Sequence, residues 1–140
     1  MKTFTYLYFL IACLFFAALS SSAKDQQIVD SLERVIKSAQ HDTISVGANL
    51  LLAEQYAYSN TKTMILFCDK ALKIIDDNIK IVKGEELHSF LLYKTWALNN
   101  IGYAYKKTGS YVKALEYYEK CLALKDSLGL TSRIPVTLIN

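Results

Sequence analysis

The sequence predicts an all-α protein built from consecutive antiparallel helix hairpins. From Asp25 onward, apolar residues recur at intervals of three and four, which is the period of an amphipathic helix and differs from the alternation of strands. Turn-forming residues such as Gly, Asn and Ser interrupt this pattern repeatedly. Because the turns are short, neighbouring helices are expected to lie antiparallel. At 140 residues, the chain has room for one such domain.

A short amphipathic helix, from Asp25 to Gln40 within a segment spanning residues 24–43, is expected to open the domain. Its charged residues lie opposite an apolar stripe, so it is predicted to cap the array with its polar face outward. The helix is expected to stop at His41-Asp42-Thr43. The apolar stripe consists of Ile28, Leu32, Val35, Ile36 and Ala39.

Two helix hairpins are expected to follow, over residues 44–84 and 85–130. Ser59-Asn60 is a turn pair that offers N-cap side chains, and Gly84 and Gly129 are suited to left-handed helix ends. In the final segment, residues 131–140, Pro135 fits only a first helical turn, so a further helix is expected to begin there. The four expected helices of the two hairpins span residues 44–58, 62–83, 85–107 and 111–128.

The N-terminal segment, residues 1–23, has the three parts of a secretory signal peptide. Lys2 provides the basic start, Phe4 to Leu19 is an apolar run, and small residues lead up to Ala23, after which cleavage is expected. The exported protein would then be periplasmic or secreted. An uncleaved anchor is an alternative, although the apolar run is shorter than the roughly 20 residues that span a bilayer. Lipidation at Cys13 is a second alternative, but apolar residues follow Cys13 where a polar tether is usual.

Charge and cysteine content narrow the function classes. Sixteen basic and thirteen acidic residues give a net charge of +3 with no clustered basic face, which argues against nucleic-acid binding by this segment. Removal of the signal segment would leave Cys68 and Cys121. Two isolated cysteines at apolar helical positions are not a disulfide framework, and they are expected to act as small buried hydrophobic residues.

The helices over 85–107 and 111–128 carry a repeat motif. Its spacing resembles the tetratricopeptide repeat, whose pattern is W-x2-L-G-x2-Y followed by A-x3-F. Leu98 replaces the first aromatic residue, Tyr118 replaces the Phe, and Asp126 replaces the closing Pro. The resemblance implies that Gly102 and Ala114 let two helices approach closely while larger residues fill the surrounding space. The matching residues are Leu98, Ile101, Gly102, Tyr105, Ala114, Tyr118 and Cys121.

A weaker copy of the motif precedes this one, and the start of another follows. Leu52-Ala53 and Tyr56 correspond to Ile101-Gly102 and Tyr105, and the later positions are filled by Met64, Cys68 and Ala71, after a turn that is one residue shorter. Leu138-Ile139-Asn140 repeats the beginning of the motif. Because about three repeats are needed for a stable stack, we expect further repeats in a longer protein, or a homo-oligomer.

The signal segment, Val29-Asp30-Ser31-Leu32, His41-Asp42-Thr43 and the repeats together resemble the N-terminus of bacterial sensor proteins. In that family, a periplasmic tetratricopeptide array precedes a transmembrane helix and a cytoplasmic histidine kinase or DNA-binding output domain. The resemblance therefore implies the exported sensory or scaffolding segment of a signalling protein. The alternative is a cell-envelope assembly or export factor that holds a client protein in the same groove. The sequence that follows Asn140 would separate the two.

The resemblance also implies a peptide-binding groove, lined by the first helix of each hairpin. Asn99 could bond a peptide backbone, and Lys106 or Lys107 could meet an acidic side chain or a terminal carboxylate. The alternative is that Trp96 and Tyr103 pack against the neighbouring repeat while the lysines are solvated. The expected groove residues are Trp96, Asn99, Tyr103, Lys106, Lys107, Leu50, Glu54, Ala57 and Tyr58.

Nothing in the sequence predicts a catalytic, cofactor or metal site. His41 and His88 lack ligand companions at helical spacing. Glu85-Glu86 is expected to complement the dipole at the start of a helix. No phosphate-binding loop, serine elbow or Cys-x-x-Cys motif occurs. The tyrosines at 103, 105, 111, 117 and 118 are expected to pack between helices.

Overall fold

The computed structural model describes residues 25–130, and this part of the chain is helical apart from short turns. The predicted all-α fold class is confirmed. The expected signal segment and the expected start of a further repeat at residues 131–140 lie outside the described residues. A helix over residues 25–38 is followed by α2 (Asp42–Gln55), α3 (Thr61–Asn78), α4 (Gly84–Lys107) and α5 (Tyr111–Ser127).

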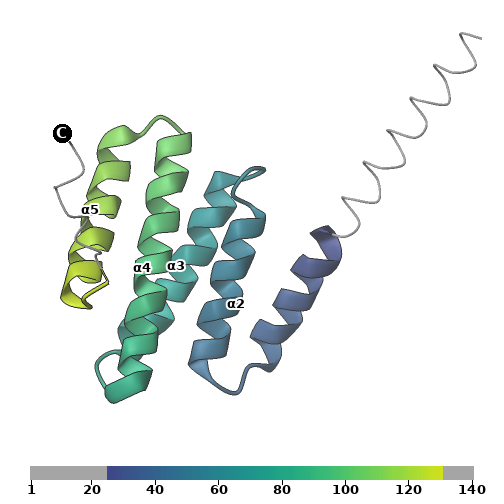
Figure 1. Cartoon of the computed structure of the whole chain (residues 1–140). Helices are drawn as coiled ribbons and strands as arrows, with labels where there is room; N and C mark the ends of the chain where they lie inside the picture. The colour runs from purple at the N-terminus through teal and green to yellow at the C-terminus, as the bar shows by residue number, and fades with distance from the viewer. Residues whose placement is uncertain (1–24, 131–140) are drawn as a thin grey trace, which may run out of the picture.

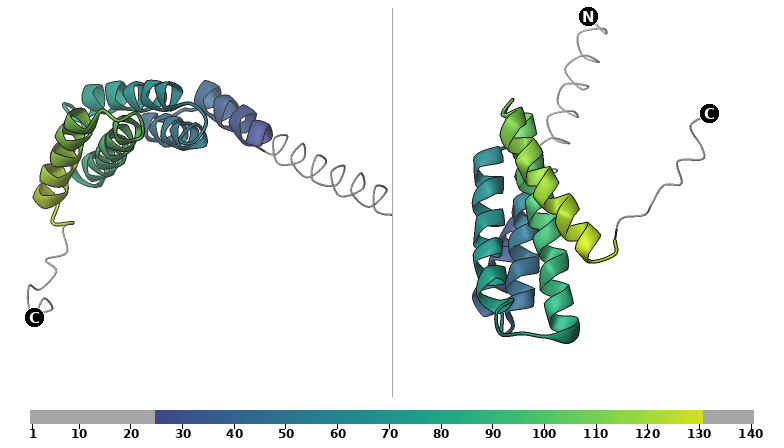
Figure 2. Two further views of the ribbon diagram at one scale, coloured as in Figure 1. Left: turned by 90° about the horizontal axis from the view of Figure 1, so that it is seen from above. Right: turned by 90° about the vertical axis from the view of Figure 1, so that its left-hand side faces the viewer.

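Consecutive helices pack side by side as antiparallel hairpins (Figure 1). α2 packs on α3, α3 on α4 and α4 on α5, and α2 also contacts α4 across the junction of the two hairpins. Seen from above, the helices follow an arc with α2 and α4 on its inner side and α3 on its outer side (Figure 2). The first helix of each hairpin therefore lines the concave side.

α3 begins at the predicted cap but ends earlier than expected. Asn60 Oδ1 accepts a hydrogen bond from the backbone N–H of Thr63 at 3.1 Å, which confirms Asn60 as the N-cap. The helix stops at Asn78 and does not continue to Lys83. Gly84 has a positive φ of 63°, but it opens α4 and does not close α3.

The side chain of Asn78 accounts for this early end. Its amide nitrogen donates to the carbonyl of Ile74 at 2.9 Å and to Asp42 Oδ2, at the start of α2, at 2.7 Å. Asparagine competes in this way with backbone hydrogen bonds, which is why it favours helix ends over helix interiors. The backbone N–H groups of Ile81 and Val82 then both bond to the Asn78 carbonyl, forming the turn toward α4.

Glycines close α4 and α5 with the same geometry. Gly109 has a φ of 77°, and the N–H groups of Gly109 and Ser110 bond to the carbonyls of Lys106 and Tyr105. This pair of bonds is a Schellman motif, which needs a residue in the left-handed region. Gly129, with a φ of 69°, ends α5 in the same way, as predicted.

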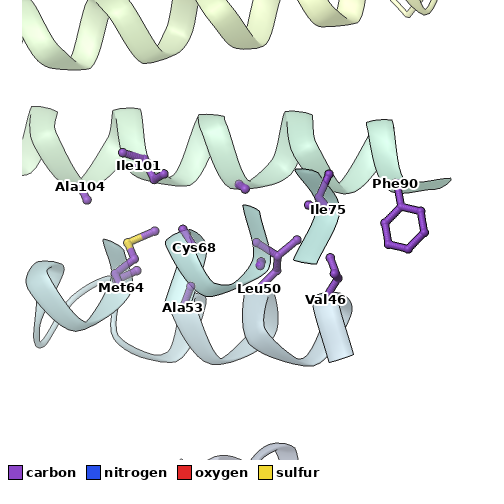
Figure 3. Packing of buried hydrophobic residues seen from close by; sticks show 12 residues of the cluster. Val46, Leu50, Ala53, Met64, Cys68, Ile75, Phe90, Ile101 and Ala104 are labelled. Carbon is purple, nitrogen blue, oxygen red and sulfur yellow. The ribbon is translucent and has the colours of Figure 1, made fainter. Parts of the chain in front are cut away.

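One continuous core fills the space between α2, α3 and α4 (Figure 3). Large side chains from all three helices meet there, and alanines between them let the backbones approach. The buried residues of the core are Val46, Leu50, Ala53, Ala57, Met64, Cys68, Ala71, Ile75, Phe90, Ala97, Ile101 and Ala104.

The second hairpin depends on a close approach between α4 and α5. A Cβ atom built on Gly102 would lie 2.8 Å from Cδ1 and Cε1 of the Tyr118 ring, a separation that real Cβ contacts do not show. Ala114, on α5, is also buried. The glycine and the alanine of the motif therefore lie where the two helices touch, as the repeat pattern predicts.

The first hairpin repeats the packing of the second. Tyr105 and Tyr117 stack between α4 and α5 with ring centroids 5.6 Å apart, and Tyr56 and Phe67 stack between α2 and α3 at 5.8 Å. In each pair, a lysine ammonium lies over the second ring: Lys120 is 5.0 Å from the centroid of Tyr117, and Lys70 is 4.6 Å from that of Phe67. The positions that the two motif copies pair in the sequence thus have the same neighbours in space.

The lead-in helix over residues 25–38 packs less tightly than the hairpins. Its inward face is half-buried, and Ile28 and Val35, both placed on the apolar stripe, are each 37% exposed. The stripe is therefore rotated from the one predicted. Its half-buried apolar members are Val29, Leu32, Ile36 and Ala39.

Cys68 and Cys121 are both buried free thiols, in agreement with their expected role as small core residues. Cys121 Sγ donates to the Thr95 carbonyl at 3.3 Å. Burial, with a smaller contribution from the charges of Asp69 and Glu54, raises the pKa of the Cys68 thiol to about 12. Cys68 therefore remains a thiol at neutral pH.

Replacing Gly102 by alanine should lower the free energy of unfolding. Overpacking against the Tyr118 ring costs about 1–3 kcal/mol, which outweighs the gain of about 1 kcal/mol that alanine has over glycine in a helix. Urea unfolding followed by circular dichroism measures the change. In the Tyr118→Leu background, which removes the ring, the same substitution should become neutral or stabilising. Equal effects in both backgrounds would contradict the proposed contact.

Cys68 should resist thiol reagents in the folded protein. At pH 8 a thiol with a pKa of about 12 is ionised to only about one part in ten thousand, against roughly a quarter for an ordinary cysteine. The pKa of Cys68 is higher in the folded than in the unfolded protein. The protonated thiol therefore makes its full contribution to the free energy of unfolding below about pH 8.5, and this contribution is lost as the pH rises through 12. Iodoacetamide labelling, located by peptide mass spectrometry, tests this, and rapid native labelling at pH 8 would contradict it.

Candidate functional site

A pocket of about 400 Å³ lies on the concave side, between the C-terminal end of α2 with the turn that follows it and the C-terminal half of α4. We call it the α2–α4 pocket. It combines aromatic rings, one carboxylate and two amides, so its polar groups converge on a small volume. It is lined by Glu54, Ala57, Tyr58, Met64, Asn99, Asn100 and Tyr103.

Polar contacts between α2 and α4 frame this pocket. Trp96 Nε1 donates to Glu54 Oε1 at 2.7 Å, which holds the carboxylate in place. Lys107 Nζ lies 3.4 Å from the Ala57 carbonyl and 4.7 Å from the centroid of the Tyr58 ring. These contacts join the two hairpins on the concave side.

The phenol of Tyr103, in the pocket, is neutral at physiological pH. Burial raises the pKa of Tyr103, and the neighbouring Tyr58 raises it further by its charge and by a side-chain hydrogen bond. The pocket therefore presents hydroxyl groups and ring faces, and its formal negative charge comes from Glu54.

Most of the predicted groove residues meet in or beside this pocket. Asn99 and Tyr103 line it together with Glu54 and Tyr58. Lys106 is exposed nearby on α4. Their role in binding stays a prediction.

Trp96 and Lys107 were expected to line the groove as free side chains, but both contact other residues of the chain. The indole of Trp96 is half-buried, with its N–H bonded to Glu54 and its ring 6.3 Å from that of Tyr93. Lys107 lies against Tyr58 and, at 5.9 Å, near the Tyr103 ring. Both side chains are already engaged between the repeats, so they shape the pocket more than they offer free contacts.

The assignment of Leu50 to the groove is wrong. Leu50 is fully buried and belongs to the core between α2, α3 and α4. It is the counterpart of the exposed Asn99 in the repeat, but the second hairpin covers it. Equivalent positions therefore have different environments, because within residues 25–130 a following hairpin packs only on the first hairpin.

Asn100 is a pocket residue that the sequence pattern did not single out. It is 6% exposed, it lines the pocket, and its buried Nδ2 atom has no hydrogen-bond partner within residues 25–130. Its spacing could have revealed it, because Trp96, Asn100 and Tyr103 recur at helical intervals and so share one face of α4.

A second hollow, of about 560 Å³, lies between the lead-in helix and the first hairpin. Its walls include the apolar side chains of Ile36, Leu52, Phe67 and Ile74, with charged residues at the rim. This hollow reflects the loose packing of the lead-in helix, and none of the predicted groove residues lines it.

The remaining sequence expectations concern tyrosines, acidic residues and metals. Tyr105, Tyr117 and Tyr118 pack between α4 and α5 as expected, whereas Tyr111 is 70% exposed. Glu85 and Glu86 lie in the first turn of α4, where they complement the helix dipole. Within residues 25–130, no group of three or more His, Cys, Asp or Glu side chains is placed to hold a metal ion.

No helix among the described residues has both the length and the apolar character needed to cross a membrane.

Comparison with known proteins identifies one repeat. The family model of the tetratricopeptide repeat matches residues 95–127, which contain the C-terminal half of α4 and all of α5. Neither the curated proteins nor the solved structures give a significant match. Tetratricopeptide repeats are protein–protein interaction scaffolds and are in general not catalytic. Residues 95–127 are therefore one tetratricopeptide repeat, within an array of helix hairpins of the same kind.

Proposed function

We propose that the chain binds a segment of a partner protein on the concave side of α2 and α4. The observation that supports this most directly is the α2–α4 pocket, where Glu54, Asn99, Asn100 and two tyrosines converge. A pocket with aromatic walls and a few polar groups suits a peptide, because rings contact side chains while amides bond the main chain. The tetratricopeptide match over residues 95–127 favours the same class of ligand.

We further propose that this binding serves an exported bacterial signalling protein as its sensory or scaffolding segment. The proposal rests on the signal-like residues 1–23 and on the resemblance of the lead-in segment and the helical repeats to the N-terminus of bacterial sensor proteins. A transmembrane stretch and a kinase or helix-turn-helix motif encoded downstream of Asn140 would support it. A continuous repeat array with no output domain would instead support the assembly-factor alternative.

Replacing Asn99 and Lys106 together by alanine should weaken peptide binding about tenfold, since removing interface contacts typically costs on the order of 1–2 kcal/mol. Both side chains are exposed, so helicity should not change. Peptides selected from a displayed random library on the full chain provide the ligands, and fluorescence polarisation provides the affinities.

The matched control combines Lys62→Ala on α3 with Glu116→Ala on α5, two exposed residues that do not line the pocket. This control should bind as the original protein does. Equal affinities for the groove variant and the control would remove the concave side as the binding surface, and a selection that enriches no peptide would remove the proposed function.

Residues 1–23 should export alkaline phosphatase when fused in front of the enzyme without its own signal, because the segment has the charge, apolar run and small-residue exit of a signal peptide. The enzyme is active only outside the cytoplasm, so colony assays report export. N-terminal sequencing of the protein recovered after export should give Lys24 as the first residue. An inactive fusion would contradict export. Incorporation of radiolabelled palmitate that is lost in the Cys13→Ala variant would show lipidation at Cys13 in place of cleavage after Ala23.

A further inference from the structure

Glu54 places a carboxylate at the wall of the α2–α4 pocket without a cation beside it. The side chain is exposed, and its Oε1 atom accepts the hydrogen bond from Trp96 Nε1 at 2.7 Å, which fixes the position of the group. No lysine, arginine or histidine of residues 25–130 forms a salt bridge with Glu54. A carboxylate has several acceptor sites on its two oxygens, so this one can still accept hydrogen bonds from a ligand.

The aromatic rings that line the same pocket also favour a positive charge. Tyr58 and Tyr103 are both lining residues, and Lys107 Nζ lies 4.7 Å and 5.9 Å from the centroids of their rings. The face of an aromatic ring attracts a cation at such distances. Lys107 is not itself a lining residue, so the open volume remains beside rings that already attract one cation of the chain.

The carboxylate and the rings together restrict which side chain of a partner can enter. An acidic side chain would be repelled by Glu54. An aliphatic side chain would remove water from the carboxylate without offering it a donor. A neutral amide could donate to Glu54, but it lacks the charge that both the carboxylate and the rings attract. A cationic side chain satisfies both kinds of group.

Arginine suits the pocket better than lysine does. Its guanidinium group is planar and stacks on aromatic faces, and its several N–H donors can bond to Glu54 and to the side-chain oxygen of Asn99 at the same time. The lysine ammonium is a compact point charge that is more strongly hydrated, so it loses more when it leaves water.

We propose that the α2–α4 pocket takes an arginine side chain of the bound segment, with Glu54 as its counter-ion and the rings of Tyr58 and Tyr103 as its walls. This assignment rests on the proposed function, since it names the side chain that a partner inserts there. Lys106 lies outside the pocket, so the contact predicted between Lys106 and an acidic group of the segment is a separate one.

Trp96 provides the direct test, because it is the only tryptophan of the chain and its indole is bonded to Glu54. Titrating the full chain with Nα-acetyl-arginine N-methylamide should change the tryptophan emission and saturate with a dissociation constant on the order of 1 mM, as expected for a fragment of this size. The citrulline analogue has nearly the same shape but no charge, so it should bind at least about fivefold more weakly. Equal binding of the two probes, or no saturable change, would overturn the proposal.

Glu54→Gln tests the counter-ion, because it keeps an oxygen for the Trp96 N–H and removes the charge. It should lower the affinity for the arginine probe about fivefold and leave the affinity for the citrulline probe unchanged. Glu116→Gln is the matched control, since it makes the same change at an exposed residue of α5 that does not line the pocket. An arginine-probe affinity that is the same in both variants would overturn the proposal. If Glu54→Gln does not fold, the comparison of the two probes on the original protein still decides the question.

Lys107→Met tests the sign of the charge that the pocket prefers. It removes the cation that lies near the Tyr58 and Tyr103 rings, so the affinity for the arginine probe should rise about twofold or more. Lys120→Met is the control, because it removes a cation from the Tyr117 ring, outside the pocket, and it should have no effect. An unchanged or lower affinity in Lys107→Met would overturn the proposal.

The peptide library separates this proposal from the proposed function. Peptides selected on the original protein should share an arginine at one position that peptides selected on Glu54→Gln do not share. Enriched peptides without that arginine would leave the concave binding surface standing and remove the arginine pocket, whereas a selection that enriches no peptide would remove both.

Discussion

The close contact of α4 and α5 at Gly102 sets the geometry of the second hairpin. The Tyr118 ring occupies the space that any Cβ at position 102 would need, so the two backbones lie as near as the ring permits. Ala53, its counterpart on α2, is fully buried in the first hairpin. Each hairpin has a small residue where its two helices cross, so the two hairpins pack in a similar way. The outward faces of α2 and α4 therefore lie next to each other on the concave side.

The fold could be predicted because the signals that determine it are local. Helical periodicity, the Asn60 cap and the glycines after α4 and α5 each act within a few residues, so they can be recognised in the sequence. The end of α3 could not be predicted in this way. It depends on the Asn78 amide reaching Asp42 on another helix, and such a contact exists only once the hairpin has formed.

The candidate site was only partly predictable from the sequence. A position in the repeat determines which way a side chain points from its helix, but not whether a neighbouring hairpin covers that side chain. Leu50 and Asn99 point the same way from equivalent positions, yet the second hairpin buries Leu50 and leaves Asn99 exposed. The same difference applies on the outer layer, where Leu115 is 59% exposed and its counterpart Ile65 is half-buried against the core. Neighbouring hairpins, rather than the motif, therefore decide which of its positions can meet a partner.

The junction between α2 and α4 is built from two kinds of contact with opposite consequences. Toward α3, Leu50 and Ile101 exclude water and stabilise the stack. Toward the concave side, the junction instead holds Trp96 against Glu54, and no group of the described part of the chain accepts a hydrogen bond from Asn100 Nδ2. Apolar side chains at these positions would close the pocket and remove the cost of the buried amide. Retaining polar groups there sacrifices some stability of the stack, and in exchange it keeps an open pocket between the two hairpins, where we propose that a partner binds.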